Sequence, residues 1–200
     1  MPEYIKSFDD DMNFLQVLDR DTVHERGLWH ETVHFYLIVD GEYLLIQKRA
    51  EHKKNFPSCY DLSAAGHIDH DEDIEIAFQR EVYEELGLYI KDLNISKIGI
   101  IPDEILTEDI NDREFAHTYI GKINSDILSS INLQDEEVAG AFLVKINELK
   151  NIFSGISDGK IYDLNFNDTN LLLNKLNYLP HALSYLNQVI EILDKEKGNL

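Results

Sequence analysis

Three glutamates, Glu81, Glu84 and Glu85, lie close together in a stretch whose pattern predicts a helix over residues 71–86. At about 100° per residue, the apolar side chains of that helix form one ridge: Ile74, Phe78, Val82 and Leu86. The glutamates lie directly beside the ridge rather than on the opposite, solvated face. Carboxylates at the edge of a core repel one another and lose hydration, so this placement indicates that a cation offsets their charge.

The ligand chemistry indicates which cation this is. Carboxylate oxygens are hard ligands, which favour Mg²⁺, with Mn²⁺ as the alternative. The competing interpretation is an ordinary acidic amphipathic helix, which is the better explanation of any single Glu-Glu pair in so acidic a chain. The spacing of the wider segment decides between the two interpretations.

The segment from Gly66 to Leu88, GHIDHDEDIEIAFQREVYEELGL, resembles the Nudix box at all of its defining positions. The polar and glycine positions of the match are Gly66, Glu72, Arg80, Glu81, Glu84, Glu85 and Gly87. The resemblance implies the α+β fold of that superfamily, an α/β/α sandwich with a mixed sheet packed between helices. It also implies a Mg²⁺-dependent hydrolase that cleaves a diphosphate linkage with metal-activated water.

The resemblance implies roles for individual side chains. The carboxylates that match Glu81, Glu84 and Glu85 hold the cations, with Glu72 in support, so Glu84 and Glu85 are catalytic candidates. Arg80 matches the arginine that orients these glutamates, a role that suits a fixed bidentate fork among like charges. The general base of the family lies in the box or on a later loop or strand. Three candidates stay open here: Glu84, Glu114 and Glu137, the last of which is equally well explained as a surface acid.

Shorter cues outside the box resemble one branch of the superfamily, the proteins similar to type 1 isopentenyl-diphosphate isomerase. The cues are residues 27–30, 47–49, 53, 56–57, 65–67 and 112–114. In the isomerase the residues that match Arg49 and Lys53 contact the diphosphate, which makes both candidate substrate-binding residues; Lys54 is expected to be a solvated charge. The residues that match His67, Asp112 and Glu114 hold a metal ion in the isomerase. Histidines near His24 and His30 do so as well, although the spacing differs.

One departure argues against isomerase chemistry. The isomerase uses a cysteine immediately before the glycine-histidine pair, and this chain has Ala65 there. An alanine cannot transfer a proton, and Cys59 lies too early in the loop to replace it without a rearrangement. The retained box glutamates point to hydrolysis of a nucleoside-diphosphate-type or related organic diphosphate. The alternatives are an isomerase-like enzyme and a protein that binds a phosphorylated effector without cleaving it.

Composition limits the partners. The chain has 38 acidic and 18 basic side chains, a formal net charge of −20, which argues against binding nucleic-acid polymers. A small diphosphate remains compatible with this charge, because bound cations reverse the local field. A single cysteine and the lack of any apolar run near about 18 residues predict a cytoplasmic protein with no membrane segment. The sequence leaves a homodimer open.

The pattern predicts one Nudix domain over residues 1–200, with an N-terminal hairpin and connection (1–30) and a C-terminal helical extension (168–200). Further strands are predicted at 31–39, 43–48, 96–101, 113–123 and 141–146. An acidic loop is expected at 102–112 and irregular structure at 155–168. Helices are expected at 147–153, 171–178 and 182–193.

Overall fold

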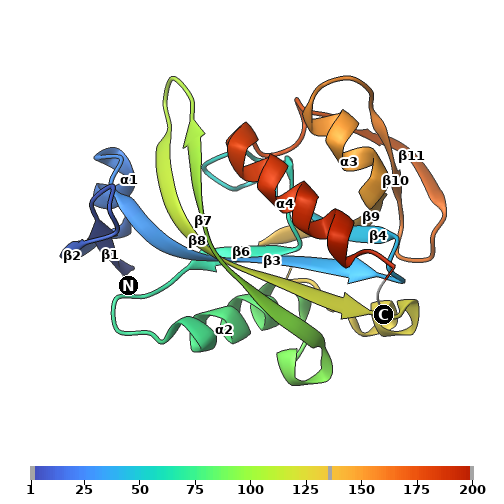
Figure 1. The fold of residues 1–200 in the computed structure, drawn as a ribbon, viewed down its shortest axis with the longest axis horizontal. Coiled ribbons are helices and arrows are strands. Elements are labelled where there is room, and N and C mark those ends of the chain that lie inside the picture. The colour runs from blue at the N-terminus through green and yellow to red at the C-terminus, as the bar shows by residue number, and fades with distance from the viewer. Residues whose placement is uncertain (1–2, 135–136, 199–200) are drawn as a thin grey trace.

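The computed structural model describes residues 3–134 and 137–198, which form one mixed sheet with helices on both faces (Figure 1). Its strands are β1 (Tyr4–Phe8), β2 (Phe14–Asp19), β3 (Trp29–Val39), β4 (Tyr43–Arg49), β5 (Tyr60–Asp61), β6 (Ala64–His67), β7 (Asn94–Leu106), β8 (Asn111–Ile123), β9 (Val138–Lys145), β10 (Gly159–Tyr162) and β11 (Asp168–Leu173). Its α-helices are α1 (Arg20–Glu25), α2 (Ile74–Leu86), α3 (Ile146–Phe153) and α4 (Leu183–Glu196). Two 3₁₀ turns follow α2 and β8: η1 (Ile90–Asp92) and η2 (Ser125–Ser130).

Strand β3 is the centre of the sheet. It pairs in parallel with β8 along its whole length, from Trp29 opposite Arg113 to Val39 opposite Ile123, and antiparallel with β1, β4 and β6. The hairpin of β1 and β2 extends one edge, whereas β9, β10 and β11 continue the sheet beyond β4. Because β3 and β8 run in parallel, their first residues lie side by side at one end of the sheet.

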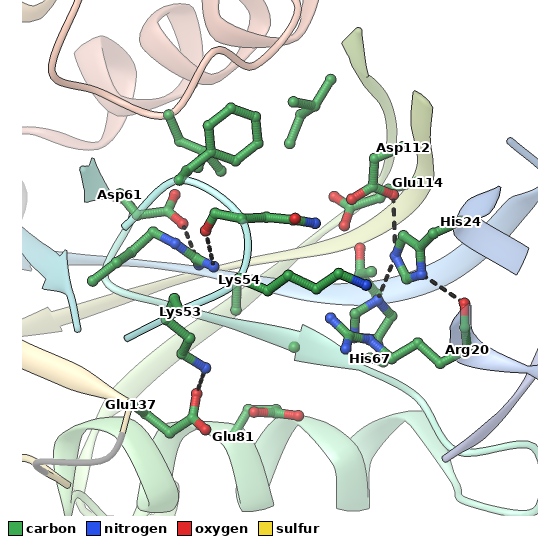
Figure 2. A pocket seen from close by; sticks show the side chains of 18 of the residues that line it. Arg20, His24, Lys53, Lys54, Asp61, His67, Glu81, Asp112, Glu114 and Glu137 are labelled. Atoms are coloured by element: carbon green, nitrogen blue, oxygen red, sulfur yellow. Dashed lines mark hydrogen bonds and ion pairs between the residues drawn. The ribbon is translucent and has the colours of Figure 1, made fainter. Parts of the chain in front are cut away.

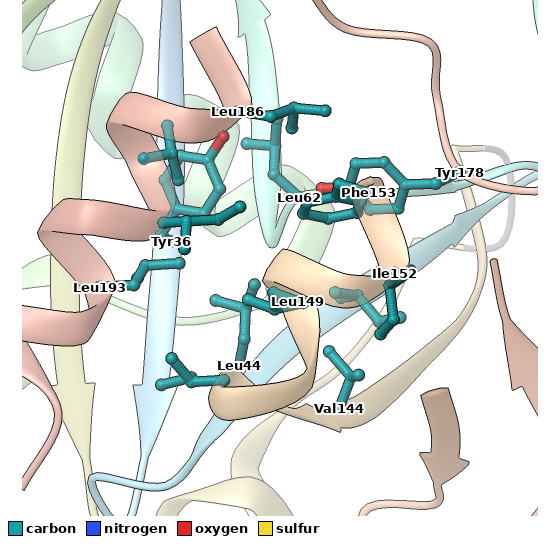
Figure 3. Close-up of a cluster of buried hydrophobic side chains, with 14 of the residues drawn as sticks. Tyr36, Leu44, Leu62, Val144, Leu149, Ile152, Phe153, Tyr178, Leu186 and Leu193 are labelled. Atoms are coloured by element: carbon teal, nitrogen blue, oxygen red, sulfur yellow. The ribbon is translucent and has the colours of Figure 1, made fainter. Parts of the chain in front are cut away.

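Successive side chains of β3 point to opposite faces of the sheet, so the core consists of two apolar layers. Val33, Phe35 and Leu37 pack on one face with α2, and Tyr36 and Ile38 pack on the other face with α3 and α4. Figure 3 shows the second core, where Tyr36 and Leu44 of the sheet meet Leu149 of α3 and Leu193 of α4. These two apolar layers confirm the α+β fold and the mixed sheet between helices that the sequence predicts.

The box helix is shorter than predicted, because it begins at Ile74 and not near residue 71. Asp73 is its N-cap, with a side chain that accepts a hydrogen bond from the Glu75 amide. Gly87 ends the helix with φ of 67°, a left-handed conformation that glycine adopts without strain. The predicted apolar ridge is confirmed, since it packs into the core beneath the sheet.

Three segments between residues 20 and 168 differ from the prediction. The connection after residue 20 contains helix α1, and the expected acidic loop at 102–112 is a hairpin in which β7 continues to Leu106 and β8 starts at Asn111. Buried Asp103 and Ile105 alternate with more exposed side chains in this part of β7, and the Ala182 amide and His181 satisfy the Asp103 carboxylate. Strand β10 also occupies part of the segment expected to be irregular.

The prediction of a helix at 171–178 is wrong, so only the end of the expected C-terminal helical extension is helical. Its first residues form β11, which pairs with β10 at the sheet edge, with Leu173 opposite Gly159. A short apolar run fits a strand as well as a helix, and pairing with β10 decides the outcome. The helix predicted at 182–193 is confirmed as α4. Within the described residues, no helix is long and apolar enough to cross a membrane.

Candidate active site

The box carboxylates lie between helix α2 and strand β6. Gly66 passes so close to Glu81 that a Cβ at this glycine would lie 2.0 Å from the carboxylate. One turn further along α2, Oε2 of Glu85 accepts hydrogen bonds from the Ala65 amide and from Nε2 of Gln47, both at 2.9 Å. The glycine therefore makes room for one buried acid, and the neighbouring backbone fixes the other.

Arg80 holds the group together. Its Nε and Nη2 donate to both oxygens of Glu72, at 2.9 and 2.8 Å. Its Nη1 contacts Glu81 at 2.6 Å and Glu84 at 3.3 Å, and Nη2 also donates to the His67 carbonyl at 3.0 Å. One guanidinium thus contacts three of the four box acids and ties α2 to the end of β6, which is the geometry needed for an orienting residue.

Burial dominates the electrostatics of two of these acids. It raises the pKa of Glu81 to about 7, in spite of Arg80, and the pKa of Glu85 to about 8. Glu72 behaves in the opposite way, since its hydrogen bonds with Arg80 lower its pKa. The arginine therefore satisfies Glu72 and pairs with Glu81, whereas the donors to Glu85 are the neutral Ala65 amide and Gln47 side chain. One guanidinium thus serves a group of four acids, as expected of a site for an additional cation.

A second cluster lies where α1, β3, β6 and β8 meet. Its ligand-type residues are His24, His30, His67, Asp112 and Glu114. Nε2 of His24 lies 3.3 Å from Nε2 of His67 and 3.5 Å from Oδ1 of Asp112, which also lies 3.5 Å from Nε2 of His30. The parallel register explains the meeting, because it places His30 of β3 opposite Glu114 of β8.

The second cluster has free ligand atoms. His30 Nε2 and Asp112 Oδ1 are buried and have no hydrogen-bond partner among the described residues. Burial lowers the pKa of His30 to about 4 and that of His67 well below its usual value, so both rings are neutral near pH 7. Burial and the Glu114 charge raise the pKa of Asp112 to about 8, whereas hydrogen bonding with His34 outweighs burial and lowers that of Glu114 to about 2.

Both clusters line one cleft of about 710 Å³, as does a group of basic side chains (Figure 2). The basic residues are Arg20, Arg49, Lys53 and Lys54. Lys53 contacts Glu137, and burial lowers its pKa. Lys54 is exposed, as expected, but its side chain extends across the cleft toward His67. The cleft thus combines acids, neutral imidazoles and cations within reach of one small ligand.

Most of the residues singled out in the sequence come together here, but some do not line the cleft directly. Glu72 acts through Arg80, and His30 lies behind His24 and His67. Cys59 is not among the cleft residues, so it does not replace the cysteine missing at Ala65, which does line the cleft.

Four cleft residues escaped the sequence reasoning: Arg20, His34, Asp61 and His181. Arg20 lies in the unpredicted helix α1. The alternation of polar Thr32 and His34 with apolar side chains along β3 is a signal that could have identified His34. Asp61 and His181 meet only through the tertiary fold, at 3.0 Å.

Comparison with known proteins agrees with this geometry. The model of the NUDIX domain matches residues 28–164. An uncharacterized Nudix hydrolase of Clostridium acetobutylicum is 34% identical over 96% of this chain and 97% of its own length. A prenyl-diphosphate phosphatase of Methanosarcina mazei is 28% identical, over 72% of this chain and 81% of that protein. An isopentenyl-diphosphate Delta-isomerase of Photorhabdus laumondii is 27% identical, over 78% of this chain and 82% of that protein.

Among solved structures, a Deinococcus radiodurans protein shares the fold with a TM-score of 0.61 at 20% identity, covering 76% of this chain and 90% of its own. The extent of the domain match and the similarity to the clostridial protein along nearly its whole length lead to one conclusion. The chain belongs to the Nudix hydrolase family, whose members act on diphosphate linkages, and it has weaker similarity to the Nudix-related isopentenyl-diphosphate isomerases.

Proposed function

We propose that this protein hydrolyses the diphosphate linkage of a small organic diphosphate, with divalent cations held by the box acids. The observation that carries the proposal is the cleft itself, where two clusters of cation ligands face the basic side chains of Arg49 and Lys53. A diphosphate needs both kinds of partner, because its charge is divided between bound cations and hydrogen-bond donors.

The residues fit divalent cations. The four box acids share one arginine, and the pKa values of Glu81 and Glu85 are raised. Their oxygens suit Mg²⁺, with Mn²⁺ as the alternative. In the second cluster, the unpartnered atoms of His30 and Asp112 form a mixed nitrogen and oxygen set that also suits Mn²⁺ and similar first-row ions. We assign Glu84 to the first site, with Glu72 in support through Arg80, and His67 and Glu114 to the second. A bound divalent cation would neutralise charge on the diphosphate and promote ionisation of the attacking water.

The protein's own residues would bind the substrate and move the proton. Arg49 and Lys53 would hold the non-bridging phosphate oxygens, and Arg80 would keep the box acids in place. Of the three candidate bases, we favour Glu84, because it lies among the box acids, 44% of its side chain is exposed and its contact with Arg80 is long, at 3.3 Å. Glu114 is buried against His34, and Glu137, although 43% of its side chain is exposed, forms a close ion pair with Lys53, so both are less available to accept the proton.

The organic group would lie against the apolar part of the cleft. This part consists of Phe56, Leu62, Ile105, Ile110 and Leu179. Such a wall can contact either a prenyl chain or a nucleoside base. The name of the Methanosarcina relative, a prenyl-diphosphate phosphatase, supports including prenyl diphosphates beside nucleoside diphosphates, dinucleotides and nucleotide sugars in a substrate panel. The high negative charge and the single cysteine support a small-molecule substrate and a reducing compartment such as the cytoplasm.

Isomerase chemistry is the second candidate, because the imidazole cluster resembles the metal site of that enzyme. The Ala65 methyl group in the cleft argues against it, since it supplies no proton.

A substrate panel with Mg²⁺, assayed for release of phosphate and monophosphates, tests the proposal together with proton exchange on isopentenyl diphosphate. We expect release without exchange. Exchange without release would support the isomerase, and binding without either reaction would support an effector-binding protein.

A further inference from the structure

Three side chains form a connected chain that ends in the cleft: Arg49 of β4, Asp61 of β5 and His181 of the segment before α4. Asp61 of β5 divides its two oxygens between partners: Oδ2 lies 3.5 Å from Nη1 of Arg49, and Oδ1 lies 3.0 Å from Nε2 of His181. The side chains of Asp61 and His181 are only 3% and 2% exposed. A proposed substrate-binding arginine is therefore connected to a residue just before helix α4.

The backbone fixes this arrangement. Strand β5 pairs with β4, with Asp61 opposite Gln47, and on its other side the Tyr60 amide donates to the Asn177 carbonyl at 2.8 Å. The Leu179 amide then donates back to the Tyr60 carbonyl, also at 2.8 Å. This bridge aligns the segment before α4 with β5, which places His181 beside Asp61.

His181 is held from both sides. Its Nδ1 lies 2.5 Å from Oδ2 of Asp103 on β7, whose other oxygen accepts a hydrogen bond from the Ala182 amide at 2.9 Å. Each ring nitrogen thus faces a carboxylate, so both carry protons and the ring is an imidazolium. Burial opposes that charge, but Asp103 and Asp61 outweigh burial and raise the pKa of His181 to about 10.

This group contains two cations, Arg49 and the His181 imidazolium, and two anions, Asp61 and Asp103, so its charges compensate one another. Without the imidazolium, Asp61 would have Arg49 as its only cationic partner in this group, and the guanidinium would be drawn toward the protein and away from a ligand. The Arg49 guanidinium keeps donor capacity for a phosphate group, because its contacts among the described residues are long: Nη1 to Asp61 at 3.5 Å and Nη2 to the Asn55 carbonyl at 3.3 Å.

We propose that His181 is a positioning residue for Arg49: by sharing Asp61 with the arginine, it sets the direction in which the guanidinium meets a phosphate group. This inference rests on the proposed function. It adds a part of the chain beyond the domain match, which ends at residue 164, to the substrate-binding apparatus.

The test is the affinity for methylenediphosphonate, a diphosphate analogue that is not hydrolysed, measured by calorimetry with Mg²⁺. We expect His181→Gln to weaken binding about tenfold, since the direction of one charge-assisted hydrogen-bonding group is lost. Because the effect acts through Arg49, adding His181→Gln to Arg49→Ala should weaken binding no further. In turnover, KM should rise about tenfold, while kcat changes much less.

His117→Gln is the matched control. His117 is also a buried histidine paired with a carboxylate, Glu31 at 2.8 Å, but neither residue lines the cleft. The control should leave the affinity unchanged. If His181→Gln binds as tightly as the unaltered protein, or if its loss adds fully to that of Arg49→Ala, the positioning role is wrong while the proposed function stands. If the unaltered protein does not bind the analogue at all, the proposed function fails and the inference fails with it.

A measurement on the unaltered protein covers the case in which His181→Gln does not fold. With ¹⁵N-labelled histidine rings, the His181 Nε2 signal should shift when methylenediphosphonate is added, and the His117 signals should not. A His181 signal that stays constant while the analogue binds would overturn the positioning role.

Discussion

The two clusters on the cleft differ in how their charges are balanced. In the box, Arg80 satisfies Glu72, while the buried acids Glu81 and Glu85 are left with raised pKa values. In the imidazole cluster, burial keeps His30 and His67 neutral, and Asp112 and Glu114 lie beside them. The first cluster is short of positive charge, whereas the second presents neutral nitrogen ligands.

This difference indicates that the two clusters have different roles in binding cations. The crowded carboxylates of the box would suit Mg²⁺, whereas the mixed imidazole and carboxylate ligands of the second cluster would suit a more tightly held first-row ion. We therefore expect substitutions in the box to affect mainly turnover, and substitutions in the imidazole cluster to affect mainly metal content.

Glu85→Gln should produce the largest effect. The amide keeps the shape of the side chain and an oxygen that can accept from the Ala65 amide, but it removes the charge. We expect kcat for diphosphate hydrolysis to fall on the order of 10³-fold, because stabilisation of charge in the transition state is lost. Initial-rate kinetics at saturating Mg²⁺ measure this.

Glu75→Gln is a suitable control, since Glu75 lies on the same helix, is exposed and pairs with Lys97 outside the cleft. It should retain the normal rate. Hydrolysis by Glu85→Gln at the same rate as the control would show that the box does not carry the reaction.

Gly66→Ala should have the next largest effect, because a Cβ at this position would lie 2.0 Å from the Glu81 carboxylate and displace it. A displacement of this size is expected to lower kcat/KM roughly 100-fold. Ala64→Gly, also in β6, is the control. A Gly66→Ala protein with normal kcat/KM would mean that the position of Glu81 is not critical.

The sequence predicted the box more fully than the rest of the site because the box is local. Three of its four acids, Glu81, Glu84 and Glu85, lie on one helix, so their spacing alone places them beside the core ridge. The imidazole cluster needs four elements, and its pairing of His30 with Glu114 depends on a parallel register that no local pattern encodes. The pair of His181 and Asp61 is the hardest to predict from sequence, because only a bridge between β5 and the segment before α4 brings the two residues together.

For the fold as well, the elements set by a local pattern were predicted better than those that depend on tertiary contacts. Long alternating strands such as β3 and β8 were predicted nearly to their ends, since one side chain in two enters each core. The short apolar run of β11 has no such alternation to distinguish a strand from a helix, because its strand conformation depends on pairing with β10. Helix α1 was missed because it is short, with a single fully buried side chain, Val23.

His30→Gln should have a moderate effect, on metal content more than on turnover. It removes a buried nitrogen that makes no hydrogen bond within the described part of the chain, so we expect Mn²⁺ affinity to fall at least about tenfold. Calorimetry with Mn²⁺ measures the affinity, and His70→Gln, an exposed histidine outside the cleft, is the control. Equal Mn²⁺ affinities for the two variants would exclude His30 as a ligand.

The smallest effect concerns the stability of the metal-free protein as a function of pH. The folded-state pKa of His30 is about 4, below its ordinary value of 6.5, so its contribution is present above pH 6.5 and is lost as the pH falls toward 4. The folded-state pKa of Glu85 is about 8, above its ordinary 4.5, so its contribution is present below pH 4.5 and is lost as the pH rises through 8.

Thermal unfolding in a chelator, scanned from pH 4 to 9, separates the two clusters. His30→Gln should reduce the loss of stability that occurs as the pH falls from 6.5 toward 4, and Glu85→Gln should reduce the opposite loss that occurs as the pH rises from 4.5 through 8. Added Mg²⁺ should reduce only the loss with rising pH in the unmodified protein, because it supplies positive charge beside the box acids. If both substitutions reduce a loss in the same direction of pH change, the division between a carboxylate site and an imidazole site is wrong.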